Sequence, residues 1–113
     1  TGYAAYAQSK LANVMHALDL AEAHPPTELV AYSLHPGVIS TKLLRDGFAG
    51  MRGGSVGQGA SMAIKLATAE KIAEPSGTYY NEGVPTPPSV AARDATVRAA
   101  LREVTRRFAG LDG

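Results

Sequence analysis

A tyrosine and a lysine stand four residues apart near the start of this sequence, in the stretch Tyr6-Ala7-Gln8-Ser9-Lys10. On a helix this spacing places both side chains on one face, with Cβ atoms about 5–6 Å apart. A free tyrosine has a pKa of about 10 and does little acid–base work at neutral pH, but a nearby cation favours the phenolate. The pair therefore suits proton transfer, with Tyr6 as general acid or base and Lys10 assisting it. The alternative is a surface lysine beside a half-buried tyrosine.

The composition narrows the function classes. A chain of 113 residues, 45% hydrophobic and 19% charged, is long enough for at most one domain with one modest core. The net charge of +1 provides no broad basic surface for a nucleic acid. No apolar run approaches the roughly 20 residues that cross a membrane. The sequence has no cysteine, which removes disulfides, thiolate nucleophiles and cysteine-based zinc sites. We expect no metal, and a cytoplasmic location fits this composition.

Hydrophobic periodicity predicts helices that alternate with short strands. In chain order, the predicted elements are helix 3–23, strand 28–34, helix 57–69, strand 77–81 and helix 92–109. The first strand hardly alternates between apolar and polar residues, as expected where both faces are covered in a parallel sheet. A strand–helix–strand order of this kind indicates an α/β fold with parallel pairing. Because the sequence opens inside a predicted helix and on a residue other than methionine, we expect it to be cut from a longer chain.

Charged residues of the first and last helices are predicted to face water. In the first helix these are Asp19 and Glu22. In the last helix they are Arg98, Arg102, Arg106 and Arg107. These arginines lie largely off the apolar stripe of this helix, which is formed by Val97, Leu101, Val104, Phe108 and Leu111. A solvated face is the favoured interpretation of these arginines, and an anion or nucleic-acid site is the alternative. Before this helix, Pro85–Pro88 is predicted to be an extended tether with polyproline character.

The long segment 35–56, between the first strand and the second helix, is the candidate ligand loop. In open α/β sheets, ligands bind just outside the carboxyl ends of the strands, which is where His35-Pro36-Gly37 lies. Within the segment, Gly47–Gly54 is too rich in glycine for a regular element and lacks the lysine and hydroxyl residue that end a phosphate-binding loop. It is either a substrate loop or a flexible connector. Its apolar members Phe48 and Met51 favour a hydrophobic ligand.

Several short stretches form a recognisable series. They are Tyr6–Val14, Leu34–Thr41, Gln58–Ala60, Ser76–Tyr80, Pro87–Ser89 and Ala92–Asp94. In order and separation, the series resembles the C-terminal part of a short-chain dehydrogenase/reductase of the classical type. The resemblance is greatest to the retinol dehydrogenase and WW-domain oxidoreductase branch of that family, and it covers nearly the whole chain.

The resemblance implies a fold and an activity. The fold would be the C-terminal portion of a Rossmann-like, doubly wound parallel sheet, with this chain holding the last two of seven strands. The activity would be that of an oxidoreductase using NAD or NADP, which interconverts an alcohol and a ketone or aldehyde by hydride transfer. The catalytic residues would be Tyr6, as general acid or base, and Lys10, which would assist Tyr6 and hydrogen-bond the nicotinamide ribose.

The resemblance also assigns cofactor contacts to the loop after the first strand. Pro36 and Gly37 would shape this loop against the nicotinamide. The backbone of Ile39 would hold the nicotinamide carboxamide, and the hydroxyl of Thr41 would contact the carboxamide or the pyrophosphate.

The family's N-terminal dinucleotide-binding half has no counterpart in these residues. Its glycine-rich fingerprint, the residue that chooses NAD or NADP, and the catalytic serine and asparagine of the family would precede Thr1. We therefore expect the 113 residues alone to be inactive. Strand 28–34 would present an open edge, able to pair with another copy, the missing half or an aggregate, and a homodimer through the first helix is also implied. The alternative to an enzyme is a non-catalytic fragment or degenerate member that serves interaction or assembly. The sequence leaves the substrate and the reaction direction open.

Overall fold

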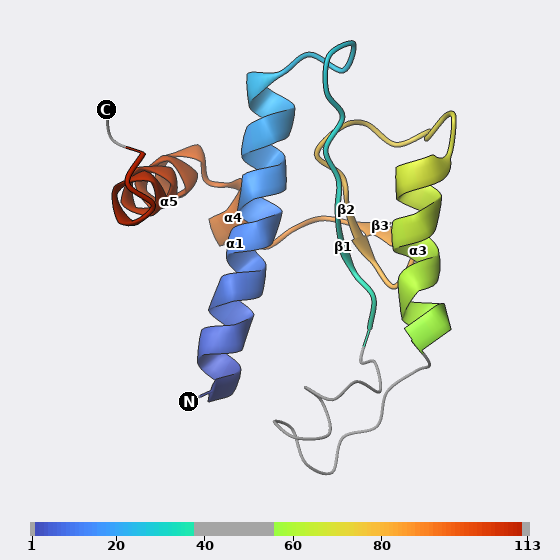
Figure 1. Cartoon of the computed structure of the whole chain (residues 1–113), viewed down its shortest axis with the longest axis horizontal. Helices are drawn as coiled ribbons and strands as arrows, with labels where there is room; N and C mark the ends of the chain where they lie inside the picture. The colour runs from blue at the N-terminus through green and yellow to red at the C-terminus, as the bar shows by residue number, and fades with distance from the viewer. Residues whose placement is uncertain (1, 38–55, 112–113) are drawn as a thin grey trace.

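The structure, a computed structural model, describes residues 2–37 and 56–111. The elements in chain order are α1 (Gly2–Ala23), β1 (Ser33–His35), α3 (Val56–Thr68), β2 (Tyr79–Asn81), β3 (Val84–Thr86), α4 (Val90–Arg93) and α5 (Ala95–Phe108). The described strands form one sheet in the order β1-β2-β3, in which β1 and β2 are parallel and β2 and β3 antiparallel. Helix α1 lies on one side of these strands and α3 on the other (Figure 1). The α/β class and the parallel pairing of the first two strands are confirmed, in a small mixed sheet.

The small core lies between α1, the sheet and α4. Its buried apolar residues are Met15, Ala17, Ala31, Tyr80 and Ala92. Both α1 residues of this set follow from the apolar periodicity of that helix. The helix ends at Ala23 because proline follows two residues later and restricts the residue before it.

The first strand is shorter than the predicted 28–34. The backbone N–H of Glu28 donates to the carbonyl of Pro25 at 2.9 Å, so the chain turns there before it extends. The segment ahead of β1 is still anchored to the sheet, since the N–H of Gly77 donates to the carbonyl of Ala31 at 2.7 Å. The strand length predicted from the apolar run was therefore wrong, because the predicted strand 28–34 begins in a turn.

Strand β3 occupies part of the predicted tether Pro85–Pro88, which corrects that prediction. A two-residue turn, Glu82-Gly83, joins β2 to β3, and both residues have positive φ, 48° and 84°. Positive φ at both central residues is what a type I′ hairpin turn requires. A proline is tolerated in β3 because this strand lies at the edge of the sheet, where its outer side needs no N–H donor.

The predicted helix 92–109 is two helices, α4 and α5. Asp94 separates them in an extended conformation, with φ −79° and ψ 110°. Its carboxylate accepts hydrogen bonds from the backbone N–H groups of Thr96 at 2.9 Å and Val97 at 3.3 Å. Aspartate is a favoured N-cap, so Asp94 ends one helix and starts the next.

Helix α5 contacts α1 through charged side chains. Arg98 is only 2% exposed, and its guanidinium pairs with Asp19 at 2.9 Å and with Glu22, and donates to the carbonyl of Ala92 at 2.7 Å. Arg102 pairs with the other oxygen of Asp19 at 2.9 Å. Burial acts to lower the pKa of Arg98, but hydrogen bonds and charge from Glu22 and Asp19 raise it overall. The prediction of a solvated face was wrong for Arg98 and Asp19.

The apolar stripe of α5 is largely exposed. Leu101 is half-buried, whereas Val97 (43% exposed), Val104 (47%) and Phe108 (90%) are exposed, as is Leu111 (62%) just beyond the helix. Across residues 2–37 and 56–111, no helix combines the length and apolarity needed to cross a bilayer.

Candidate active site

The candidate catalytic residues and the carboxyl end of β1 lie at one end of the described structure. The chain runs along α1, turns, and returns through β1, so the first turns of α1 lie at the same end as the carboxyl end of β1 (Figure 1). This follows from the helix-to-strand connection, in which the two elements run in opposite directions. The end that topology favours for a ligand is therefore also the end that carries Tyr6 and Lys10.

Tyr6 and Lys10 lie one turn apart on the exposed face of α1. The ammonium of Lys10 is 5.5 Å from the centroid of the Tyr6 ring, within the roughly 6 Å over which a cation is attracted to an aromatic face. The tyrosine is 37% exposed, so its ring is accessible to a ligand. The backbone carbonyl of Tyr6 accepts a hydrogen bond from the hydroxyl of Ser9 at 2.7 Å. The structure thus brings an accessible phenol and a cation together on one helix face.

The end of β1 and the two residues after it, Pro36 and Gly37, lie against the hairpin turn after β2. Parallel pairing sets His35 opposite Asn81, and the N–H of Glu82 donates to the carbonyl of His35 at 2.8 Å. Gly37, with φ of 92°, lies so close to Glu82 that a Cβ on it would be 2.7 Å from the carboxylate oxygen Oε1. Sequence reasoning missed Glu82 as a neighbour of the loop. The signal for it was the glycine turn at the end of the second strand, since parallel strands end at the same edge.

Replacing Gly37 by alanine is expected to destabilise the fold by about 1–2 kcal/mol, because a left-handed backbone costs an L residue about that much. The new methyl group would also meet Glu82. Urea unfolding followed by circular dichroism measures the effect.

Removing the Glu82 side chain in the same molecule separates the two causes. The Gly37→Ala/Glu82→Ala variant should recover only the part of the lost free energy of unfolding that is due to the clash with the Glu82 side chain. A Gly37→Ala variant as stable as the parent would contradict the backbone conformation described for this loop.

Part of the predicted site lies outside the described residues. This is the case for Ile39, Thr41, Phe48 and Met51. Among the residues that the structure does describe, no group of three or more histidine, aspartate or glutamate side chains gathers as a metal site would need.

Tyr80 has a shifted pKa, but its side chain packs in the core and is not part of the candidate site. Burial raises the pKa of Tyr80, and the nearby Tyr32 and Glu74 raise it further. The two tyrosine rings meet edge to face at 5.8 Å, and the Tyr32 hydroxyl donates to the carbonyl of Glu74 at 2.6 Å. A phenol with a raised pKa stays neutral at physiological pH, so Tyr80 acts here as a packing residue.

Comparison with known proteins finds retinol dehydrogenases. The chain is 30% identical over 115 residues to retinol dehydrogenase 12 of Bos taurus, with 95% of this chain and 36% of that protein covered. It is 31% identical over 86 residues to retinol dehydrogenase 12 of Mus musculus, with coverages of 69% and 27%. It is 32% identical over 123 residues to retinol dehydrogenase 13 of Homo sapiens, with coverages of 96% and 37%. The chain thus spans about a third of the length of the curated relatives it matches. No family model matches the chain, and no solved structure gives a significant match.

Proposed function

We infer that this chain, whose resemblance to the short-chain dehydrogenase/reductase family is confirmed by its retinol dehydrogenase relatives, is the C-terminal part of an NAD(P)-dependent oxidoreductase. The reaction we propose interconverts an alcohol and a ketone or aldehyde. Since the relatives are named for retinol, and since Phe48 and Met51 are apolar, the substrate class we propose is hydrophobic.

The observation that carries this proposal is the Tyr6–Lys10 pair. In the reducing direction, the Tyr6 hydroxyl gives its proton to the carbonyl oxygen of the substrate while the carbonyl carbon accepts a hydride. The ammonium of Lys10, 5.5 Å from the ring centroid, stabilises the phenolate that remains. In the oxidising direction the phenolate takes the proton back from the alcohol. When bound, the nicotinamide cofactor supplies or accepts the hydride.

The described residues fit the nicotinamide half of such a cofactor. Tyr6 and Lys10 offer hydroxyl and ammonium donors to ribose hydroxyls, and both are exposed at the end where β1 terminates. Pro36 and Gly37 form the start of the loop that would lie against the nicotinamide. By resemblance, the backbone of Ile39 would hold the carboxamide, and the hydroxyl of Thr41 would contact the carboxamide or the pyrophosphate.

The three-stranded sheet is also compatible with being one part of a larger sheet. Strand β1 pairs only with β2 among the described strands, so its other edge is open for a further strand. We propose that a preceding strand of a doubly wound sheet pairs there in the full-length protein, together with the dinucleotide-binding half that selects NAD or NADP.

The isolated 113-residue chain is expected to reduce no carbonyl substrate. Half of the cofactor site, the catalytic serine and the family's asparagine would lie in the part of the protein that precedes it. The measurement is NAD(P)H oxidation by the purified chain and by the full-length protein at equal concentration. Turnover by the 113-residue chain alone would contradict the proposed division of the active site between this chain and the part that precedes it. Inactivity of both proteins would contradict the proposal that the full-length protein is an oxidoreductase.

A further inference from the structure

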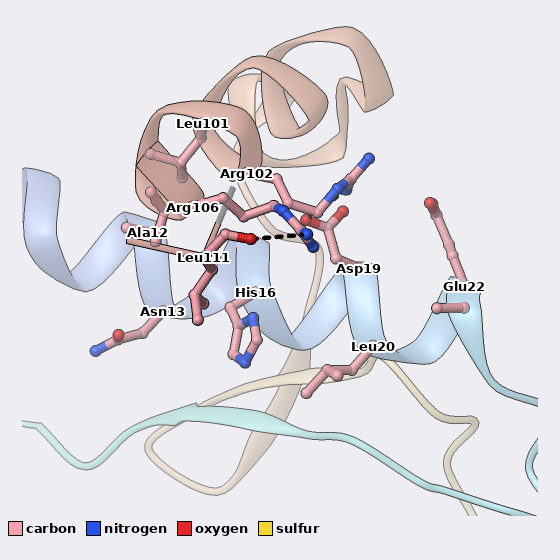
Figure 2. A pocket seen from close by; sticks show the side chains of 12 residues that line it. Ala12, Asn13, His16, Asp19, Leu20, Glu22, Leu101, Arg102, Arg106 and Leu111 are labelled. Atoms are coloured by element: carbon pink, nitrogen blue, oxygen red, sulfur yellow. Dashed lines mark hydrogen bonds and ion pairs between the residues drawn. The ribbon is translucent and has the colours of Figure 1, made fainter. Parts of the chain in front are cut away.

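A groove of about 850 Å³ lies between α1 and α5 (Figure 2). Its apolar walls include Leu20 from α1, Leu101 from α5 and Leu111 from the segment after α5. It extends along α1 from Ala12 to Ala23. It therefore begins after the turns of α1 that carry Tyr6 and Lys10. Pockets that hold small ligands have volumes of about 300–1,000 Å³ and are mostly apolar with a few polar groups. The groove therefore has the size and lining of a second site.

One end of the groove carries a cation without a carboxylate partner. Arg106 donates to the backbone carbonyl of Leu111 at 3.3 Å, and no carboxylate of the described residues pairs with it. Its neighbours on α5 differ, since Arg102 pairs with Asp19 and Arg107 pairs with Glu103, each at 2.9 Å.

Two polar side chains of α1, His16 and Asn13, also line the groove. Figure 2 shows the Asn13 side chain directed away from the guanidinium of Arg106. The imidazole of His16 adds a second kind of hydrogen-bond donor to the lining.

The acidic residues of the groove are already neutralised. Asp19 accepts from Arg98 on one oxygen and pairs with Arg102 on the other, and Glu22 pairs with Arg98. These two cations offset the two carboxylates, which leaves Arg106 as the unbalanced charge among the described residues that line the groove. The groove is therefore complementary to a ligand with a negative head and an apolar body.

We propose that this groove binds a single-chain carboxylate. The carboxylate lies on the guanidinium of Arg106, which can donate two parallel hydrogen bonds to it, in a groove that His16 also lines. The hydrocarbon chain lies along Leu20, Leu101 and Leu111. The site is separate from the proposed catalytic residues and does not depend on the proposed reaction.

The probe is decanoate, titrated into the full-length protein by isothermal calorimetry below its micelle concentration. We expect saturable binding at one site per chain, and binding of decanol at least about tenfold weaker, which corresponds to about 1.4 kcal/mol. The Tyr6→Phe variant should bind decanoate as the parent does. Equal binding of decanol and decanoate would overturn the role of the charge. Loss of decanoate binding in the Tyr6→Phe variant would overturn the placement of the site in this groove.

Arg106→Gln and Arg107→Gln form a matched pair, because they remove one positive charge from neighbouring positions of one helix. Arg106→Gln should weaken decanoate binding about tenfold, whereas Arg107→Gln should change it less than about twofold. Circular dichroism verifies that both variants keep their helices. Equal losses would mean non-specific attraction to a basic helix, and the proposal would be wrong.

Other occupants give different results. Binding to anionic lipid vesicles without binding of monomeric decanoate would mean that the groove meets a membrane surface. Sedimentation tests for a dimer. A dimer that the Arg106→Gln substitution dissociates, but that added decanoate leaves intact, would mean that a second copy of the chain fills the groove. Either result would overturn the proposal.

Discussion

Replacing Tyr6 by phenylalanine is expected to lower kcat for carbonyl reduction by about 10²–10⁴-fold in the full-length protein, the range that general acid catalysis contributes. The change removes only the phenolic oxygen, which in our proposal gives the proton to the substrate. The ring that Lys10 approaches at 5.5 Å is kept. The dissociation constant of NAD(P)H should therefore change little, and steady-state kinetics combined with a cofactor titration measures both quantities.

Tyr3→Phe is the matched control, because Tyr3 lies one turn earlier on the same helix and is also exposed, at 64% against 37% for Tyr6. It should leave kcat unchanged within about twofold, as expected for a group that does not touch the reacting atoms. A Tyr6→Phe variant with parental kcat, or equal losses in the two variants, would contradict the assignment of Tyr6 as the acid.

Replacing Arg98 by alanine is expected to destabilise the protein by about 3–5 kcal/mol, the cost of breaking a buried ion pair by removing one partner. Arg98 is 2% exposed and connects Asp19, Glu22 and the carbonyl of Ala92. Its loss leaves Asp19, whose side chain is 15% exposed, with Arg102 alone. The effect should lie toward the lower end of this range because Glu22 is 63% exposed and can be solvated. Urea unfolding monitored by circular dichroism measures the free energy.

The matched control is Arg107→Ala, which also removes an arginine with an ion-pair partner from α5. Arg107 and Glu103 are 66% and 65% exposed, and exposed pairs of this kind contribute at most about 1 kcal/mol. If Arg98→Ala were no more destabilising than Arg107→Ala, charge would not be what joins α5 to α1.

Local patterns predicted the part of the structure that depends on neighbouring residues. The helix that carries Tyr6 and Lys10 follows from its apolar period and the prolines after it, and its bounds in the structure, Gly2–Ala23, are close to the predicted 3–23. The parallel pairing of β1 with β2 follows from the strand–helix–strand order. The role of each side chain in catalysis stays a prediction.

Contacts between distant residues could not be predicted in the same way. Arg98 and Asp19 are 79 residues apart, and both appear in the sequence as members of a solvated helix face. Only the packing of α5 on α1 makes the arginine buried. The helix break at Asp94 was easier to predict from the sequence, because an aspartate that precedes a helical period is a common N-cap signal. Strand β3 was missed because its turn is Glu-Gly, a sequence less typical of hairpins than Asn-Gly.

In our proposal, the chain belongs to an NAD(P)-dependent enzyme in which Tyr6 moves the proton. The most direct test is the oxidation of NADH and NADPH by the purified full-length protein with a set of hydrophobic aldehydes and ketones, including retinal. We expect turnover with at least one cofactor and its loss in the Tyr6→Phe variant, which should still bind that cofactor. A full-length protein that binds neither cofactor and reduces none of these carbonyls would contradict the proposed function and favour a non-catalytic role in assembly.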